Sequence, residues 1–143
     1  MKLEHLHKST GIIIYDPSRP GMKSGFKQNK NHRTDWWCVL DIDREITRYL
    51  RWHLAKNVPG LVLHNPAWDA HVSILRGEEP DNNKKHLWKK YHNKKIDFWY
   101  STNVYNSNHF WTVYVYCPFI KEIRKEMNKP FDWDLHLTIG RTW

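Results

Sequence analysis

Two nine-residue segments decide what fold this sequence can adopt: Trp68-Asp-Ala-His-Val-Ser-Ile-Leu-Arg76 and Trp133-Asp-Leu-His-Leu-Thr-Ile-Gly-Arg141. They align without a gap, 65 residues apart, and are identical at five of the nine positions: Trp, Asp, His, Ile and Arg. Side chains at positions i and i+2 of a strand point to the same face. If both segments are strands, each presents an imidazole beside a hydroxyl on one face and aliphatic side chains on the other.

The two segments are significant because their flanking residues match, and not because of the short His-x-Ser/Thr pattern alone. His7-Lys-Ser9 and His32-Arg-Thr34 match the short pattern too, but both lie in polar stretches without matching flanks. We therefore restrict the functional prediction to the two duplicated segments, with His71, Ser73, His136 and Thr138 as the candidate catalytic residues.

The predicted elements repeat in the same order in the two halves of the chain. Apolar residues at helical spacing predict helices that begin near Asp43 and Pro118 and end before Pro59 and Pro130. Runs rich in β-branched and aromatic residues predict strands over 11–15, 36–42, 61–63, 70–76, 95–101, 109–117 and 135–141. The polar segment 80–95 predicts a helical turn, and 17–35 predicts a mobile basic loop.

Each half is thus predicted to contain two strands, a helix and a final strand that carries the histidine motif (the motif strand). This repeated order predicts an α+β fold that arose by duplication. We expect one domain, 1–143, with a first lobe over about 11–77 and a second over about 94–143, or a version in which the lobes exchange strands. Two antiparallel sheets would face a central cleft, with the helices outside. Each motif strand would pack on the helix of its own half.

The composition favours polyanionic partners. Lys and Arg outnumber Asp and Glu by 23 to 15, which gives a formal net charge of +8, and aromatic residues make up 15% of the chain, with nine Trp. Basic and aromatic side chains together are typical of surfaces that bind nucleotides or RNA. We therefore expect a polyanionic partner such as a nucleotide or RNA.

Other features predict a soluble, cytoplasmic monomer without metal or cofactor. The chain begins with charged residues and has no apolar run long enough to span a bilayer, so no membrane association is expected. Cys38 and Cys117 lie in apolar runs, which predicts buried thiols and not a disulfide framework. His5 and His7 lack the spacing of metal ligands relative to the other histidines.

Two imidazoles facing one cleft are a sufficient set for cleaving a phosphodiester. A neutral histidine can take a proton from the attacking water or ribose hydroxyl, and an imidazolium can give one to the leaving oxygen. The adjacent Ser and Thr hydroxyls can donate hydrogen bonds to the nonbridging phosphate oxygens. The sequence does not distinguish which histidine is the base and which is the acid.

Several further side chains are candidates for substrate binding. The strand 109–117 has one apolar face, which leaves Tyr114 and Tyr116 on the other, where they can stack on a base. The remaining candidates are Tyr15, Trp99, Trp143, Arg76 and Arg141. By strict alternation both arginines lie off the imidazole face and reach it only if a bulge interrupts the strand.

The residues that precede each histidine leave alternatives open. Asp69 and Asp134 either orient the imidazoles, as a carboxylate does in a triad, or are turn residues at the strand entry. Trp68 and Trp133 are predicted to point away from the histidines into the core.

Two His-x-Ser/Thr strands in a duplicated α+β chain resemble the 2H phosphoesterase superfamily, also called LigT-like. The resemblance implies a metal-independent phosphodiesterase with catalytic roles for His71, Ser73, His136 and Thr138. Members act on 2′,3′-cyclic phosphates, 2′-5′ linkages, cyclised ADP-ribose or cyclic nucleotide immune signals. The compact length is similar to virus and phage members that degrade such signals in the host cytoplasm.

Two other functions stay open at this point. The chain could be a non-catalytic module that binds RNA or nucleotides on the same fold, although both motifs are intact. It could also join RNA ends by the reverse chemistry, which the lack of a nucleotide-activating motif such as a P-loop disfavours.

Overall fold

The computed structural model describes residues 6–17, 35–66 and 68–142. Most of the predicted basic loop over 17–35 and the candidate Trp143 lie outside these residues, as does His32-Arg-Thr34. His7-Lys-Ser9, in contrast, lies within a strand, so the first strand begins earlier than the apolar pattern of residues 11–15 predicted.

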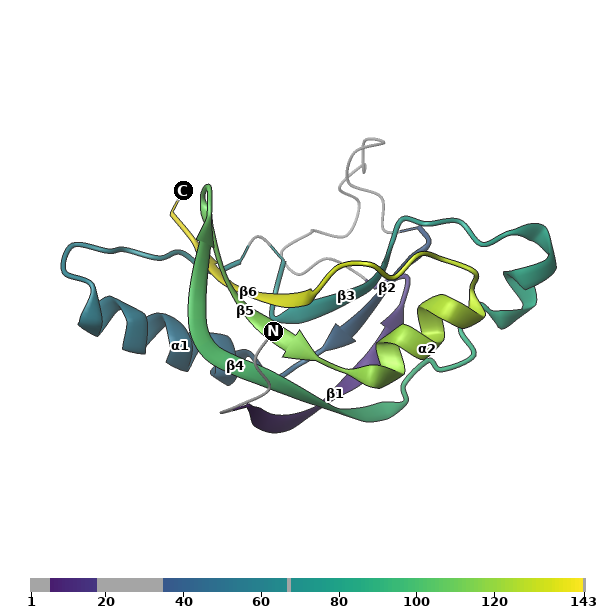
Figure 1. Ribbon diagram of the computed structural model, residues 1–143, viewed down its shortest axis with the longest axis horizontal. Helices are drawn as coiled ribbons and strands as arrows, with labels where there is room; N and C mark the ends of the chain where they lie inside the picture. The colour runs from purple at the N-terminus through teal and green to yellow at the C-terminus, as the bar shows by residue number, and fades with distance from the viewer. Residues whose placement is uncertain (1–5, 18–34, 67, 143) are drawn as a thin grey trace, which may run out of the picture.

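The six strands found in the described residues form one antiparallel sheet (Figure 1). They are β1 His7–Tyr15, β2 Trp37–Asp41, β3 His71–Arg76, β4 Lys95–Ser107, β5 Phe110–Tyr116 and β6 Leu135–Arg141. The α+β class is therefore confirmed. The predicted division into two sheets is corrected, because β1 and β4 pair along Ile12 to His7 and join the two halves into a single sheet.

The order of strands in the sheet is β3-β2-β1-β4-β5-β6, which places the two motif strands at opposite edges. The sheet curls strongly, so that these two edges come back into contact with each other. Figure 1 shows β6 running beside β3. The motif strands are therefore distant in the order of the sheet but neighbours in space.

Two helices, α1 Arg44–Asn57 and α2 Pro118–Glu126, pack against the sheet. The Asp43 carboxylate caps α1 by accepting a hydrogen bond from the Glu45 backbone N–H at 2.9 Å. Pro118 starts α2, where its lack of an N–H costs nothing. The predicted packing is wrong: α1 contacts β6, and α2 contacts β3, so each motif strand packs on the helix of the other half.

The remaining local predictions are confirmed, except that β4 continues past its predicted end at residue 101 and that one predicted strand does not form. Residues 82–87 form a 3-10 helix, η2, within the polar segment, and β4 and β5 form a hairpin whose turn includes Asn108 with a positive φ of 56°. Residues 61–63 do not form a strand. The neighbouring His64 makes only an isolated bridge to Arg141 of β6.

The core lies on the face of the sheet opposite to the motif histidines. It is built from aliphatic and aromatic side chains of every strand and of both helices, among them Ile13, Leu40, Val72, Phe98, Ile120 and Leu137. Cys38 and Cys117 are both buried and free, as predicted. None of the helices in the described part of the chain is long and apolar enough to cross a membrane.

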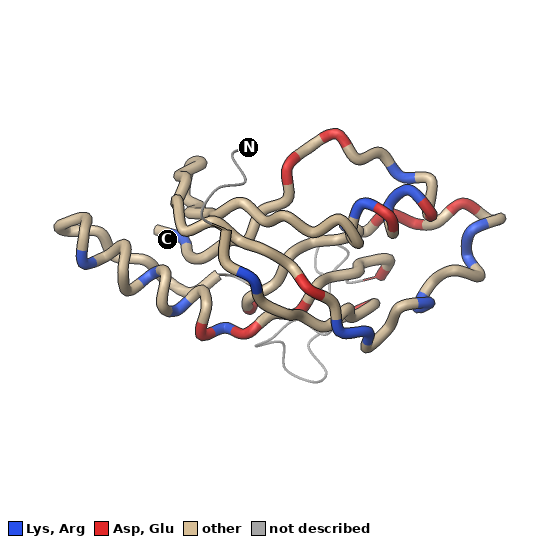
Figure 2. Tube along the Cα trace, turned by 60° about the horizontal axis from the view of Figure 1, so that its bottom comes forward, with Lys and Arg blue, Asp and Glu red and all other residues tan. Residues whose placement is uncertain are grey.

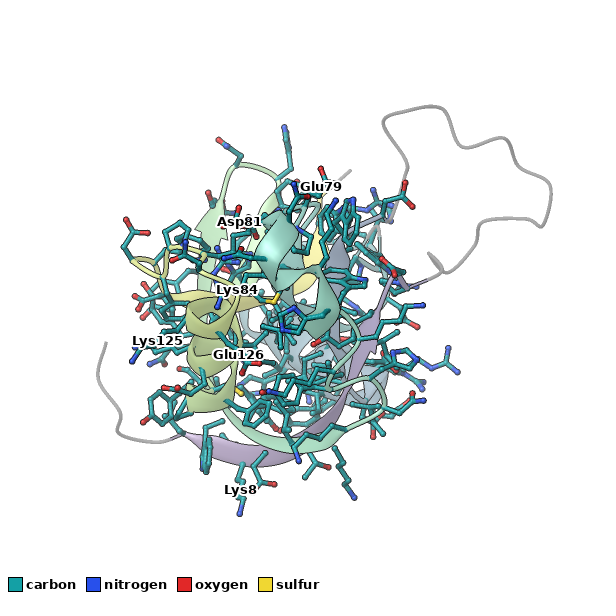
Figure 3. All side chains as sticks on the ribbon, turned by 90° about the vertical axis from the view of Figure 1, so that its right-hand side faces the viewer. Lys8, Glu79, Asp81, Lys84, Lys125 and Glu126 are labelled. Carbon is teal, nitrogen blue, oxygen red and sulfur yellow. The ribbon has the colours of Figure 1, made fainter. Side chains whose placement is uncertain are left out.

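Lys and Arg positions lie among Asp and Glu positions along the segments at the end of the molecule that carries α2 (Figure 2). The segment that contains η2 is tied to α2, because Lys90 Nζ lies 2.7 Å from a carboxylate oxygen of Glu126 and the Tyr91 hydroxyl donates to the other oxygen at 2.7 Å. Figure 3 shows Glu126 on α2 beside η2 at this end. Lys85 pairs similarly with Glu79, at 3.3 Å. Several lysines of this segment therefore pair with carboxylates.

Candidate active site

A β-bulge interrupts the first motif within β3. In the pairing of β3 with β2, Ser73 lies opposite Val39 and Leu75 lies opposite Cys38, so that Ile74 is an extra residue. A bulge of this kind shifts the alternation of side chains by one position. The burial along β3 agrees, because Ile74 and Leu75 are both buried although they are adjacent.

The bulge turns Arg76 onto the face of the catalytic candidates. Trp37 and Val39 are two residues apart in β2 and share a face, and they lie opposite Arg76 and Ser73. Arg76 therefore shares the face of Ser73 and His71, although strict alternation predicted the opposite.

The second motif contains the same bulge at the matching position. In the pairing of β6 with β5, Thr138 lies opposite Thr112 and Gly140 lies opposite Trp111, so that Ile139 is the extra residue. Arg141 then lies opposite Phe110, on the face of Thr138. In both motifs the shared Ile is thus the extra residue of the bulge, and the shared Arg is the residue that the bulge moves to the other face.

The two redirected arginines differ in what they contact. Arg76 lines the space beside His136, and its charge lowers the pKa of both motif histidines. The Arg141 Nε instead donates a hydrogen bond to the backbone carbonyl of Asn65 at 3.1 Å. Of the two arginines, Arg76 is the one that the fold brings to the candidate site.

The imidazole of His71 is fixed by a backbone group. Its Nδ1 lies 2.7 Å from the carbonyl oxygen of Asp69, and because a carbonyl only accepts, Nδ1 carries the proton. The unprotonated nitrogen of neutral His71 is therefore Nε2. The Asp69 carboxylate accepts from the Ala70 N–H at 2.9 Å, so the predicted carboxylate partner of His71 is replaced by the backbone of the same residue.

Both histidines are held toward the neutral state. Burial lowers the pKa of His71 from its ordinary value of 6.5, with further lowering from the charges of Arg76 and His136 against opposing effects of Asp69. Burial also lowers the pKa of His136, and Arg76 adds to the effect. The two imidazoles and Arg76 are therefore close enough to influence one another.

A hollow of about 420 Å³ opens beside His136. Its walls come from the last strands of the sheet and carry aromatic, hydroxyl and charged side chains. They are Arg76, Tyr105, Ser107, Phe110, Thr112, Tyr114, Asp134, His136 and Thr138. Two tyrosine rings of this wall, Tyr105 and Tyr114, lie 4.7 Å apart between centroids. The hollow combines a cation, one carboxylate, hydroxyl donors and aromatic surface around one histidine.

A second hollow, of about 280 Å³, opens beside His71 and has a different character. Asp41, Asp69 and Trp68 line it with three apolar or aliphatic residues. Burial raises the pKa of Asp41, and the neighbouring Asp69 raises it further. An anion is therefore favoured on the side of Arg76 and disfavoured on the side of Asp41.

The two motifs also face each other directly. A small gap of about 20 Å³ is lined by Ser73 and Arg76 from β3, by His136 from β6, and by the side chains of Arg124 and Trp133. The structure thus brings together three of the four catalytic candidates around this gap and the large hollow, with His71 coupled to them electrostatically.

Some predicted binding residues lie elsewhere. Tyr15 is only 4% exposed and packs edge-on against Trp88 in the core, so it does not form a binding surface. Trp99 and Tyr116 contact each other, with ring centroids 5.8 Å apart, on β4 and β5 away from the large hollow. Tyr114 is the predicted aromatic residue that lines the hollow.

Other residues of the site were missed or misassigned from the sequence. Trp68 was predicted to be core, but its ring lies 4.8 Å from that of His71 and lines the second hollow. Trp133, also predicted to be core, is 43% exposed. Tyr105 lies beyond the predicted end of its strand, because β4 continues to Ser107. A longer strand prediction would have placed Tyr105 near Tyr114.

No family model, no curated protein and no solved structure matches the chain. Among residues 6–17, 35–66 and 68–142, no three His, Cys, Asp or Glu side chains gather in the manner of a metal site.

Proposed function

We propose that this protein is a phosphodiesterase that cleaves a nucleotide or RNA phosphodiester by acid–base catalysis with His71 and His136. The observation that carries the proposal is the meeting of the two motif strands, with Arg76 turned toward both imidazoles. Two histidines, hydroxyl donors and one guanidinium supply proton transfer and anion binding at one place. The resemblance of the two motifs to the 2H phosphoesterases supports the same chemistry, and so does their proposed origin by duplication.

The phosphate lies on the side of the large hollow. Arg76, Thr138 and His136 line that hollow, whereas the hollow beside His71 is acidic. The guanidinium and the hydroxyl donate to the nonbridging oxygens, which gain charge in the transition state. The rings of Tyr105 and Tyr114 offer an apolar surface for the attached nucleoside.

His71 acts as the general base and His136 as the general acid. A charge on His136 lowers the pKa of His71, and the His71 Nδ1 is bound to the Asp69 carbonyl, which leaves Nε2 to accept a proton. These contacts suit His71 to the role of base, and they suit His136, which lines the large hollow with Arg76 and Thr138, to the role of acid beside the leaving oxygen. Neutral His71 offers Nε2 to the attacking hydroxyl or water, and protonated His136 gives its proton to the leaving oxygen.

A substrate panel tests the proposal. It contains 2′,3′-cyclic nucleotides, 2′-5′ and 3′-5′ oligoadenylates, cyclic di- and trinucleotides and cyclised ADP-ribose, with products identified by mass spectrometry. We expect cleavage of at least one class, its loss in folded His71→Ala and His136→Ala variants, and full activity in the presence of a strong chelator. Full activity in either variant, or loss on chelation, would contradict the mechanism. Salt-dependent binding without any product would favour the non-catalytic binding module.

A further inference from the structure

Each of the two bulges is held by an arginine from the helix of the other half of the chain. The Arg124 Nη1 of α2 donates a hydrogen bond to the carbonyl of Ile74 in β3 at 2.8 Å. The Arg51 Nη1 of α1 donates to the carbonyl of Ile139 in β6 at 2.8 Å. In each bulge, the carbonyl of the extra residue therefore accepts a hydrogen bond from a guanidinium.

The bulged carbonyls need such a donor. A bulge leaves its extra residue without a regular partner in the ladder. Ile74 is 1% exposed and Ile139 is fully buried, so water has little access to either residue. A buried carbonyl without a donor is unfavourable, and a guanidinium on a long side chain can reach it from a helix.

Arg124 has a second contact that extends its effect to Arg76. Its guanidinium makes a bidentate pair with the Glu78 carboxylate, at 2.8 and 2.9 Å. One oxygen of that carboxylate also accepts from the backbone N–H of Arg76 at 3.0 Å. The backbone is thus held on both sides of the bulge, at the carbonyl of Ile74 and at the amide of Arg76.

The turn that returns Glu78 to this position depends on Gly77. Gly77 has a φ of +67°, which side chains with a Cβ rarely adopt, and an added Cβ would lie 3.1 Å from the Trp37 indole nitrogen. Arg124 itself is 1% exposed, and its Nε donates to the Pro130 carbonyl at 2.8 Å. Its guanidinium is therefore engaged by protein groups on several sides.

We infer that Arg124 is a positioning residue, which holds the β3 bulge together with Glu78 and thereby aims the Arg76 guanidinium at His71 and His136. A role of Arg124 in catalysis rests on the proposed function. The position of Arg76 relative to the two histidines can be tested without any substrate. Arg51 holds the matching bulge in β6.

The pKa values of the two imidazoles report where Arg76 points. NMR titration of His71 and His136 in the full chain would compare wild type with Arg76→Met, Arg124→Lys and Glu78→Gln. Lys keeps the buried charge but cannot reach the Ile74 carbonyl and both carboxylate oxygens together. Gln keeps the shape of Glu78 but weakens the pair with Arg124. Arg48→Met serves as the control, because Arg48 is an exposed residue of α1 that pairs with Glu45.

We expect Arg76→Met to raise both imidazole pKa values toward 6.5, because it removes a positive charge that lowers them. Arg124→Lys and Glu78→Gln are expected to raise them in the same direction, and the double variant Arg124→Lys/Arg76→Met should add nothing to Arg76→Met alone. Arg48→Met should leave both values unchanged.

Two outcomes would overturn the inference. One is a folded Arg124→Lys or Glu78→Gln variant whose imidazoles titrate as in wild type while Arg76→Met raises their pKa values. The other is an Arg76→Met variant with unchanged titration, which would mean that Arg76 is not aimed at the histidines. If no substrate of the panel is cleaved, the proposed function fails, but the titration result still decides the positioning role of Arg124.

Discussion

The Nδ1 of His71 lies 2.7 Å from the carbonyl oxygen of Asp69, which fixes the proton on Nδ1 and leaves Nε2 as the basic nitrogen. The bond comes from backbone two residues earlier in the chain, so the orientation of this imidazole is built into the entry of β3.

Two substrates that differ in their leaving group distinguish the general base His71 from the general acid His136. A phosphodiester that releases 4-nitrophenolate needs little protonation of its leaving oxygen, whereas an alkoxide needs much. We expect His136→Ala to lose roughly 10²–10⁴-fold in kcat with an alkyl leaving group and far less with the aryl one. His71→Ala should lose a similar factor with both substrates. Initial-rate kinetics measure the two ratios, and rescue of His71→Ala by the aryl substrate would reverse the assignment.

The activity should have its maximum on the acidic side of pH 6.5. The reaction needs neutral His71 and protonated His136, and burial and Arg76 lower the pKa of both residues below 6.5. As pH rises, His136 loses its proton, so kcat/KM falls about tenfold per pH unit on the alkaline limb. Arg76→Met should shift this limb to higher pH, because removal of the positive charge raises the pKa of His136. An alkaline limb that begins well above pH 7 in wild type would contradict this assignment.

Arg76 and Arg141 form a matched pair for a test of anion binding. A charge-assisted hydrogen bond contributes about 1.5–3 kcal/mol, which corresponds to roughly 10- to 150-fold in kcat/KM. We expect a loss of this size in Arg76→Met, because Arg76 lines the hollow beside His136. Arg141→Met should lose much less, since the Arg141 guanidinium is engaged with the Asn65 carbonyl. Equal losses would place the phosphate elsewhere.

The junction of the two halves should be sensitive to a single methyl group. A Cβ at Gly11 in β1 would lie 2.7 Å from Leu40 Cγ and 2.9 Å from the Asp41 carbonyl oxygen. The backbone oxygen cannot move away cheaply, so Gly11→Ala is expected to reduce the free energy of unfolding by about 1–3 kcal/mol. Urea denaturation measures the change. Thr10→Val, an exposed neighbour in the same strand, should change it by less than roughly 0.5 kcal/mol.

The sequence by itself determined the motif strands and the face of their histidines. Alternation of polar and aliphatic residues predicted β3 and β6 closely, and it placed His71 with Ser73 and His136 with Thr138 on one face each. Asp43 and Pro118 predicted the starts of both helices. These features depend on neighbours within a few residues along the chain, so local patterns carry them.

Only the tertiary structure decided where the arginines point and which helix backs which strand. The bulges at Ile74 and Ile139 exist only in the register with β2 and β5, and their carbonyls bind guanidinium groups 50 and 88 residues away in the chain. A pairing register is set by contacts between distant segments, so counting residues along one strand predicted the wrong face for Arg76. Likewise, the curl of a single sheet, and not the order of its strands, brings the two histidine motifs into contact.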